Sequence, residues 1–192
     1  GKGALLKDID GNVYVDCGAG IGVLNVGHGD PDIIAAITEG VKNYNGPTFQ
    51  VTPYKAIIEL AEKLDEIAPG KTHKKVYFIN SGSEANENNV KLARAYTGKT
   101  GIFSLENCFH GRSYMALALT SKTKPYKLGL GPFPADIQKL PSPYCYRCPF
   151  NSTYPECGLA CAEKLAILLL SEFHKDSMAA VIAEPIQGEG GF

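Results

Sequence analysis

The chain has 192 residues, of which 44% are hydrophobic and 20% charged, and its formal net charge is −1. These values fit a globular domain with a substantial core, and the nearly neutral charge gives no electrostatic basis for binding nucleic acid or an anionic membrane. No apolar run reaches the length of a membrane span and the N-terminus lacks the pattern of a signal peptide, so we expect a cytoplasmic location.

The first thirty residues predict short, turn-rich structure. Residues 4–6 and 12–16 are strand candidates, and the Asp10-Gly11 turn between them favours a hairpin. Residues 18–25 are apolar and rich in glycine, which indicates a loop packed closely against other residues. We therefore expect a hairpin and a loop before the first helix.

Two helices are predicted next. Pro31 follows Asp30, and proline in the first turn after an aspartate cap is typical of a helix start. The second helix begins at Pro53 and ends at Pro69-Gly70. In both segments apolar residues recur every three or four positions, which predicts helices with one apolar face.

Strand-like and helix-like runs then alternate. In order, they are a strand at 75–79, a helix at 84–96, a strand at 101–104, a helix at 111–119, a helix at 159–174 and a strand at 178–183. Residues 121–158 are rich in proline, glycine and tyrosine and predict a long excursion. The alternation predicts an α/β fold whose mostly parallel sheet is covered on both faces, with ligands bound at the carboxyl ends of its strands.

The segment Ser81-Gly82-Ser83 lies between a predicted strand and a predicted helix. Free N–H groups in the first turn of a helix bind anions, so this turn is a candidate phosphate site. Glu84 follows Ser81 by three residues, as in a capping box. A capped helix without a ligand is the alternative, and a nucleotide-binding module is disfavoured because there is no G-x-G-x-x-G after a strand and no Walker lysine.

Two further segments that follow predicted strands carry side chains able to bind a ligand. Phe109-His110-Gly111-Arg112 combines an aromatic ring for stacking with a guanidinium that can grip an anion. Glu184 and Glu189 flank a Pro/Gly loop and could orient a ligand or pair with an arginine. Taken singly, each segment also fits an ordinary polar loop.

Four motifs in this order resemble the class III (ornithine/4-aminobutyrate type) aminotransferases, which use pyridoxal 5′-phosphate (PLP). They are Gly18–His28, Asn80–Glu87, Phe109–Arg112 and Glu184–Gly191. The resemblance implies the PLP-dependent transferase fold type I, with residues 1–30 in a small domain and residues 31–192 forming the first part of the large PLP-binding domain. It also implies that the lysine forming the Schiff base with PLP lies beyond Phe192, so we expect these residues alone to be inactive.

The resemblance implies roles for particular residues. Those near the cofactor are Ser81, Gly82 and Ser83 at the phosphate, Phe109 on the ring, His110 and Gly111 in the turn, and Glu184 beside the site. Those near the substrate are Ile21 in the pocket wall, Arg112 on a distal carboxylate, and Glu189, which would pair with an arginine later in the chain.

The expected activity is transfer of an amino group from an ω-amino acid such as 4-aminobutyrate to a keto acid such as 2-oxoglutarate. The segments Ser113–Met115, Pro125–Lys127 and Gly131–Pro134 favour the 4-aminobutyrate branch. Acetylornithine, ornithine, β-alanine and alanine–glyoxylate aminotransferases and class III-like amino-acid racemases are the alternatives. The resemblance further implies a homodimer.

Four cysteines lie in and just after the excursion, spaced as Cys145-x2-Cys148-x8-Cys157-x3-Cys161. Four thiolates so spaced predict a zinc ion or an iron–sulfur cluster that staples the loop. Disulfides and free packed thiols are the other interpretations. A metal-stapled binding module built on these cysteines is the different class of function that the sequence leaves open.

Overall fold

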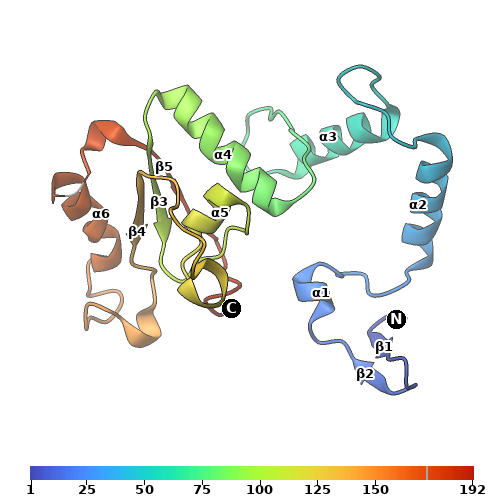
Figure 1. Cartoon of the computed structure of the whole chain (residues 1–192), viewed down its shortest axis with the longest axis horizontal. Helices are drawn as coiled ribbons and strands as arrows, with labels where there is room; N and C mark the ends of the chain where they lie inside the picture. Colours follow the sequence, from blue (N-terminus) through green and yellow to red (C-terminus); the bar gives the residue numbers. More distant parts are fainter. Residues whose placement is uncertain (172) are drawn as a thin grey trace. The chain divides into compact units, whose positions relative to one another are not determined.

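The computed structural model describes residues 1–171 and 173–192. It separates into two compact units, Gly1–Val76 and Tyr77–Phe192, and each is described by itself (Figure 1). The predicted division at residue 30 concerns the domains of a longer protein and stays a prediction.

The first unit opens with the predicted hairpin. Strands β1 (Leu5–Lys7) and β2 (Val13–Val15) pair antiparallel. The Asp8 carboxylate closes the turn by accepting the backbone N–H of Asn12 at 2.8 Å. Part of the predicted loop that follows winds into α1 (Ala19–Gly22), a single turn with left-handed residues inside it.

The two predicted helices of this unit are confirmed. Helix α2 runs over Pro31–Asn43, and the Asp30 carboxylate caps it by accepting two backbone N–H groups of its first turn. Helix α3 covers Lys55–Ile67 and ends just before Pro69-Gly70, as proline and glycine predict.

The second unit is built on a three-stranded parallel sheet. Strand β3 (Gly101–Leu105) lies in the middle, between β4 (Ile137–Leu140) and β5 (Met178–Ile182). Its helical segments are α4 (Gly82–Thr97), α5 (Tyr114–Leu119), α6 (Ala160–Ser171) and the short turns η1 (Thr123–Lys127), η2 (Cys145–Arg147) and η3 (Lys175–Ser177). The parallel α/β arrangement expected from the alternating runs is confirmed.

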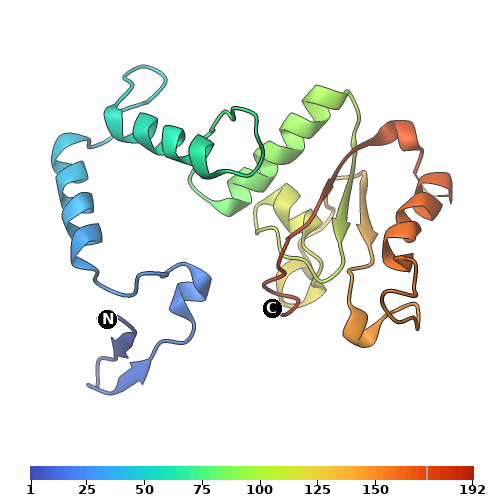
Figure 2. The same ribbon diagram turned by 180° about the vertical axis from the view of Figure 1, so that it is seen from behind.

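Helices cover both faces of this sheet, α4 and α5 on one side and α6 on the other (Figure 2). Successive residues of β3 point to opposite faces, so Ile102 packs with Val90 of α4 and Leu119 of α5. Phe103 points the other way, into a second cluster completed by residues of β4 and α6. Both side chains are at most 1% exposed, so β3 is the centre of the core.

One predicted strand is absent, and one observed strand was not predicted. Residues 75–79 form no strand, because none of the described strands pairs with them. Apolar composition signals burial, whereas a strand also needs a neighbour for its N–H and C=O groups. The predicted excursion at 121–158 contains β4, whose short Ile-Gln-Lys-Leu sequence carries too weak an apolar pattern to be recognised.

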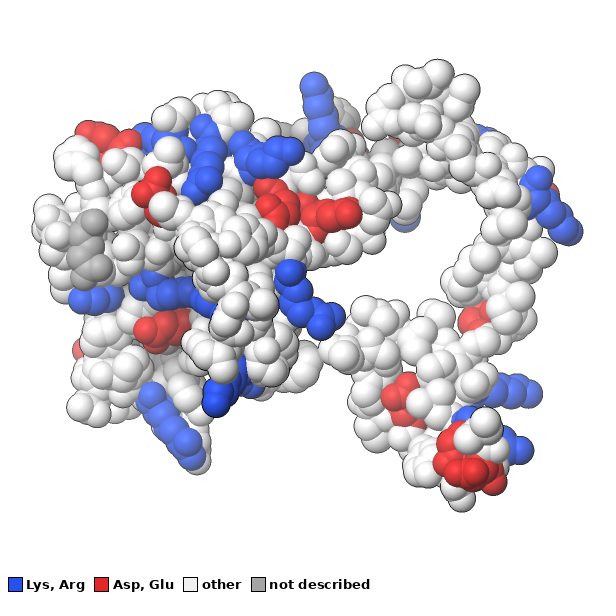
Figure 3. Space-filling view, viewed as in Figure 1, with Lys and Arg blue, Asp and Glu red and all other residues white. Residues whose placement is uncertain are grey.

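The carboxyl ends of the strands gather the candidate residues, as expected for a parallel sheet. Strand β3 leads into the loop that carries Phe109–Arg112, and β5 leads into Glu184–Glu189. Each described helix is either too short or too polar to span a lipid bilayer. On the face shown in Figure 3, lysine and arginine side chains are scattered among uncharged and acidic ones.

Candidate functional site

The turn before α4 forms a reciprocal cap. The Ser81 hydroxyl accepts the backbone N–H of Glu84 at 3.2 Å, and the Glu84 carboxylate accepts that of Asn80 at 2.8 Å. Among the hydrogen bonds between described residues, the backbone N–H groups of Gly82 and Ser83 have no acceptor. The predicted capping box and the predicted pair of free donors are thus present together.

The Ser83 side chain ties α4 to the loop after β3. Its Oγ accepts the backbone N–H groups of Arg112 at 3.2 Å and Ser113 at 3.0 Å, and it lies 2.7 Å from the Ser113 Oγ. Because Ser113 donates its only hydroxyl hydrogen to Glu87, the Ser83 hydroxyl must donate to Ser113. The Ser83 side chain is therefore fully engaged, and only its backbone N–H remains for a ligand.

Two residues that the sequence did not single out hold the same loop. The Asn86 amide donates to the carbonyl of His110 at 2.7 Å. One carboxylate oxygen of Glu87 accepts the Ser113 hydroxyl at 2.7 Å and the backbone N–H groups of Met115 and Ala116 at 2.9 and 3.2 Å. Both lie one helical turn inside α4, within the Asn80–Glu87 motif, so the motif itself is the signal that could have found them.

Gly111 occupies a position that only glycine fits. Its φ is +123°, and a Cβ built on it would lie 2.4 Å from the Ser83 Oγ and 2.9 Å from the Ser83 Cα. The loop can therefore approach the start of α4 closely only because this side chain is missing.

His110 is buried, with 5% of its surface exposed. Its backbone N–H donates to the Thr120 hydroxyl at 3.0 Å, but its Nε2 has no hydrogen-bond partner among the described residues. Burial lowers the pKa of the imidazole; the nearby Glu184 carboxylate opposes that shift and Lys139 adds to it. The ring is therefore neutral near pH 7 and has one unused nitrogen.

This lowered pKa makes a prediction about acid stability. The unfolded chain binds a proton on His110 that the folded protein does not, so stability falls as the pH drops below about 6.5. We expect the loss of unfolding free energy between pH 7 and pH 5 to be smaller in His110→Asn than in the unsubstituted protein, measured by urea unfolding. His174→Asn is the control, because His174 is exposed, and it should lose as much unfolding free energy between pH 7 and pH 5 as the unsubstituted protein. The same loss in His110→Asn would contradict a lowered pKa of His110.

Glu184 joins the loop after β5 to the loop after β3. One of its oxygens accepts the backbone N–H of Phe109 at 3.0 Å, and the other accepts that of Gly188 at 3.3 Å. The carboxylate thus positions the backbone beneath the Phe109 ring, which is a positioning role beside the predicted ligand contact.

Glu189 is paired inside this unit. Its carboxylate accepts the Lys122 ammonium at 2.5 Å and the Tyr126 hydroxyl at 3.0 Å. Both bonds lower the pKa of Glu189, the one from Lys122 more strongly. The Tyr126 ring in turn meets the Phe109 ring edge-on, with centroids 5.2 Å apart.

The start of α4 and the loop after β3 line an open cavity of about 600 Å³. It is lined by Ser81, Gly82, Ser83, Glu84, Asn86, Phe109, His110, Gly111, Arg112 and Ser113. Free helix N–H groups beside an aromatic ring suit a flat phosphate ester. The site therefore fits the cofactor that the sequence predicts.

The remaining predicted residues are placed differently. The Arg112 side chain is exposed at the cavity and, in the described part of the chain, only its backbone makes a hydrogen bond. Ile21 lies in the first unit, 96% exposed and with φ of +64°, so its place in a substrate pocket stays a prediction.

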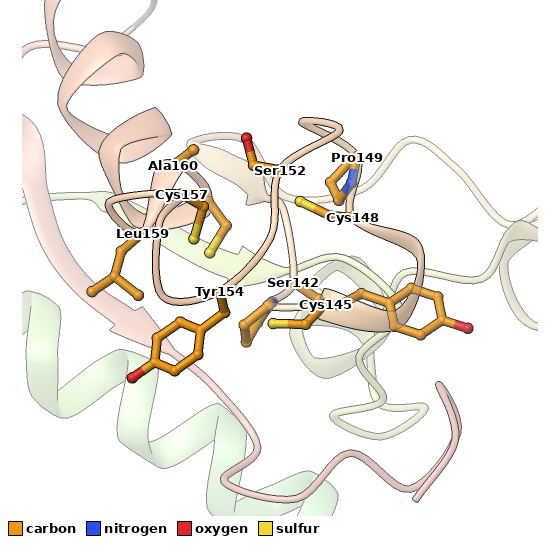
Figure 4. A pocket seen from close by; sticks show the side chains of 12 residues that line it. Ser142, Cys145, Cys148, Pro149, Ser152, Tyr154, Cys157, Leu159 and Ala160 are labelled. Carbon is orange, nitrogen blue, oxygen red and sulfur yellow. The ribbon is translucent and has the colours of Figure 1, made fainter.

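The four clustered cysteines line one apolar pocket of about 260 Å³, between η2 and the start of α6 (Figure 4). All of them are free. Within residues 1–171 and 173–192, no three histidine, cysteine, aspartate or glutamate side chains are placed to hold one metal ion. The predicted zinc or iron–sulfur site is thus not formed in this structure, because spacing brings the thiols to one pocket without making them converge. Cys145 is exposed and the other three thiols are partly buried, and the alternative of free packed thiols stays a prediction.

Comparison with known proteins gives a consistent answer over the whole chain. Residues 1–192 match the family model described as aminotransferase class-III. A probable 4-aminobutyrate aminotransferase of Bacillus subtilis is 42% identical over 100% of this chain and 44% of its own length. A 5-aminovalerate aminotransferase of Pseudomonas aeruginosa is 40% identical over 96% of this chain and 42% of its own length. The chain thus spans less than half the length of these relatives.

Solved structures agree with the sequence relatives. An amine transaminase from an uncultivated Pseudomonas species, in a PLP-bound form, superposes with a TM-score of 0.91 at 29% identity and covers 100% of this chain and 44% of its own. An (S)-enantioselective omega-transaminase from Thermomicrobium roseum gives a TM-score of 0.91 at 32% identity, with the same coverage. The fold is therefore that of the PLP-dependent transaminases.

Proposed function

The chain belongs to the class-III aminotransferase family, and from that premise we propose that the whole protein moves an amino group from an ω-amino acid to a keto acid with the help of PLP. The observation that carries the proposal is the cavity in which free N–H groups of α4, the Phe109 ring and the Arg112 side chain come together. PLP, when bound, supplies an electron sink for reactions at the carbon next to an amine.

The residues of this chain would hold the cofactor and keep its surroundings ordered. The Gly82 and Ser83 N–H groups would bind its phosphate, aided by the dipole of α4. Phe109 would cover one face of its ring, on a backbone held by Glu184. The buried His110 adds a neutral wall. We propose none of the lysines in residues 1–192 as the one that forms the Schiff base with PLP.

Arg112 would bind the carboxylate of the amino donor. Its guanidinium is exposed at the cavity, and a planar fork of donors suits bidentate binding of a carboxylate. The names of the relatives, 4-aminobutyrate and 5-aminovalerate aminotransferases, support a linear ω-amino acid as donor. 2-Oxoglutarate is the proposed acceptor. Acetylornithine, ornithine, β-alanine, alanine–glyoxylate or racemase activity are the alternatives within the family.

An absorption spectrum of the whole protein tests this proposal. We expect a visible band from bound PLP that changes when 4-aminobutyrate is added without a keto acid and is restored by 2-oxoglutarate. A band that responds to another amine would keep the family and replace the donor. The absence of such a band after PLP is supplied would contradict the proposed function.

A homodimer and a cytoplasmic location stay predictions, and sedimentation of the whole protein would test the first.

A further inference from the structure

The four clustered cysteines have no role in the proposed function, yet their side chains line one pocket (Figure 4). All four thiols are free, and they differ in their access to solvent. Cys145 is exposed, whereas Cys148, Cys157 and Cys161 are partly buried. A thiol must be accessible to react with a dissolved oxidant, so Cys145 is the member of the cluster that an oxidant reaches first.

Cys148 is the partner that the backbone brings to Cys145. Cys145 begins the 3₁₀ turn η2, and Cys148 follows the last residue of that turn. A 3₁₀ helix has three residues per turn and rises about 2 Å per residue, so residues three apart lie above one another with Cα atoms about 6 Å apart. Disulfides join Cα atoms that are roughly 4.4 to 6.8 Å apart. The two thiols can therefore bond after side-chain rotation, without a change of fold.

The other two cysteines lack this arrangement. Cys157 and Cys161 are separated by three residues, which include Gly158 and Leu159, and both of these have a positive φ. Helix α6 begins only at Ala160. Two successive left-handed residues break the regular spacing that aligns side chains four apart along a helix. The backbone thus favours a bond within the C-x2-C pair.

The segment that carries this pair is anchored to the core. Ser142 is 5% exposed, and its hydroxyl donates to the backbone carbonyl of Glu106. The Ser142 carbonyl accepts the backbone N–H of Tyr144 at 2.8 Å, and the Tyr144 carbonyl accepts that of Arg147 at 3.2 Å. These bonds hold the backbone around Cys145, so little conformational freedom is lost when a second thiol attacks its sulfur.

We propose that Cys145 and Cys148 form a redox-active dithiol, a modification site in a different cavity from the candidate PLP site. The oxidant is a low-molecular-weight disulfide of the glutathione disulfide class. The Cys145 thiolate attacks one sulfur of this disulfide, and the other sulfur leaves as a thiol. The Cys148 thiolate then attacks the Cys145 sulfur and expels the second small thiol. The protein thiols lose two electrons and two protons, which convert the small disulfide into two thiols.

Oxidation of the whole protein by glutathione disulfide, followed by peptide mapping, tests this proposal. We expect the loss of two free thiols and a disulfide between Cys145 and Cys148, both reversed by dithiothreitol. In Cys148→Ser, the reaction should stop at the mixed disulfide, so Cys145 should carry the added mass of one glutathione. Cys145→Ser should leave Cys148 reduced.

Cys17→Ser is the matched control, because Cys17 is also exposed but has no other cysteine near it in the sequence. It should still form the Cys145–Cys148 disulfide. A disulfide that includes Cys157 or Cys161 would overturn the proposal, as would about one zinc ion per chain held by the four thiolates of the reduced protein.

The unsubstituted protein decides the question even if the cysteine variants do not fold. The absence of a Cys145–Cys148 disulfide in its peptide map after oxidation would overturn the proposal. Neither the peptide map nor the thiol count needs PLP or an amino donor, so a missing PLP band would count against the proposed function alone.

Discussion

Replacing Gly111 with alanine is expected to destabilise the protein and to weaken PLP binding. Alanine at this position would have to adopt an unfavourable φ of +123°, and its Cβ would lie 2.4 Å from the Ser83 Oγ. Three hydrogen bonds hold that oxygen in place. Backbone strain and overpacking together cost about 3 to 5 kcal/mol. Relief requires the loop to move away from α4, which would disturb the cavity that the loop and the first turn of α4 line together.

Urea unfolding and a titration of PLP absorbance of the whole protein would measure both effects. Gly98→Ala is the matched control, because Gly98 also has a positive φ, of +68°, but its Cβ would meet nothing within 4 Å. It should cost only about 1 kcal/mol and leave PLP binding unchanged. Unaltered PLP affinity in Gly111→Ala would show that the loop and α4 do not cooperate in holding the cofactor.

The second large effect is expected at Glu87. Its carboxylate accepts the Ser113 hydroxyl and the backbone N–H groups of Met115 and Ala116, in the first turn of α5. Alanine would leave these three donors without their acceptor at the start of a helix whose other residues are mostly buried. Loss of charged hydrogen bonds and of a helix cap predicts a destabilisation of about 2 to 3 kcal/mol.

Unfolding curves of three variants separate capping from a general effect of charge. Glu87→Gln keeps an acceptor oxygen and should recover more than half of the loss. Glu163→Ala removes an exposed glutamate from the first turn of α6 and should change stability by about 0.5 kcal/mol. If Glu87→Ala matched Glu163→Ala, the carboxylate would have no special role in seating α5.

Much of the fold follows from local patterns. Asp30-Pro31, Ser81 with Glu84, and Pro69-Gly70 mark helix ends because capping depends on neighbouring residues alone. The apolar pattern of a single segment is a less reliable indicator of a β-strand. Residues 75–79 are apolar yet unpaired, and β4 is paired although weakly apolar, because pairing depends on residues far away in the chain.

The same division holds for the site. Local sequence alone determined the free donors at the start of α4, since helix geometry leaves the first N–H groups unbound wherever a helix begins. Only the tertiary structure decided that Glu87 seats α5, that Glu184 holds the backbone of Phe109, and that Glu189 pairs with Lys122. Such contacts join segments 28 to 75 residues apart, and spacing along the chain carries no information about which side chains meet after folding.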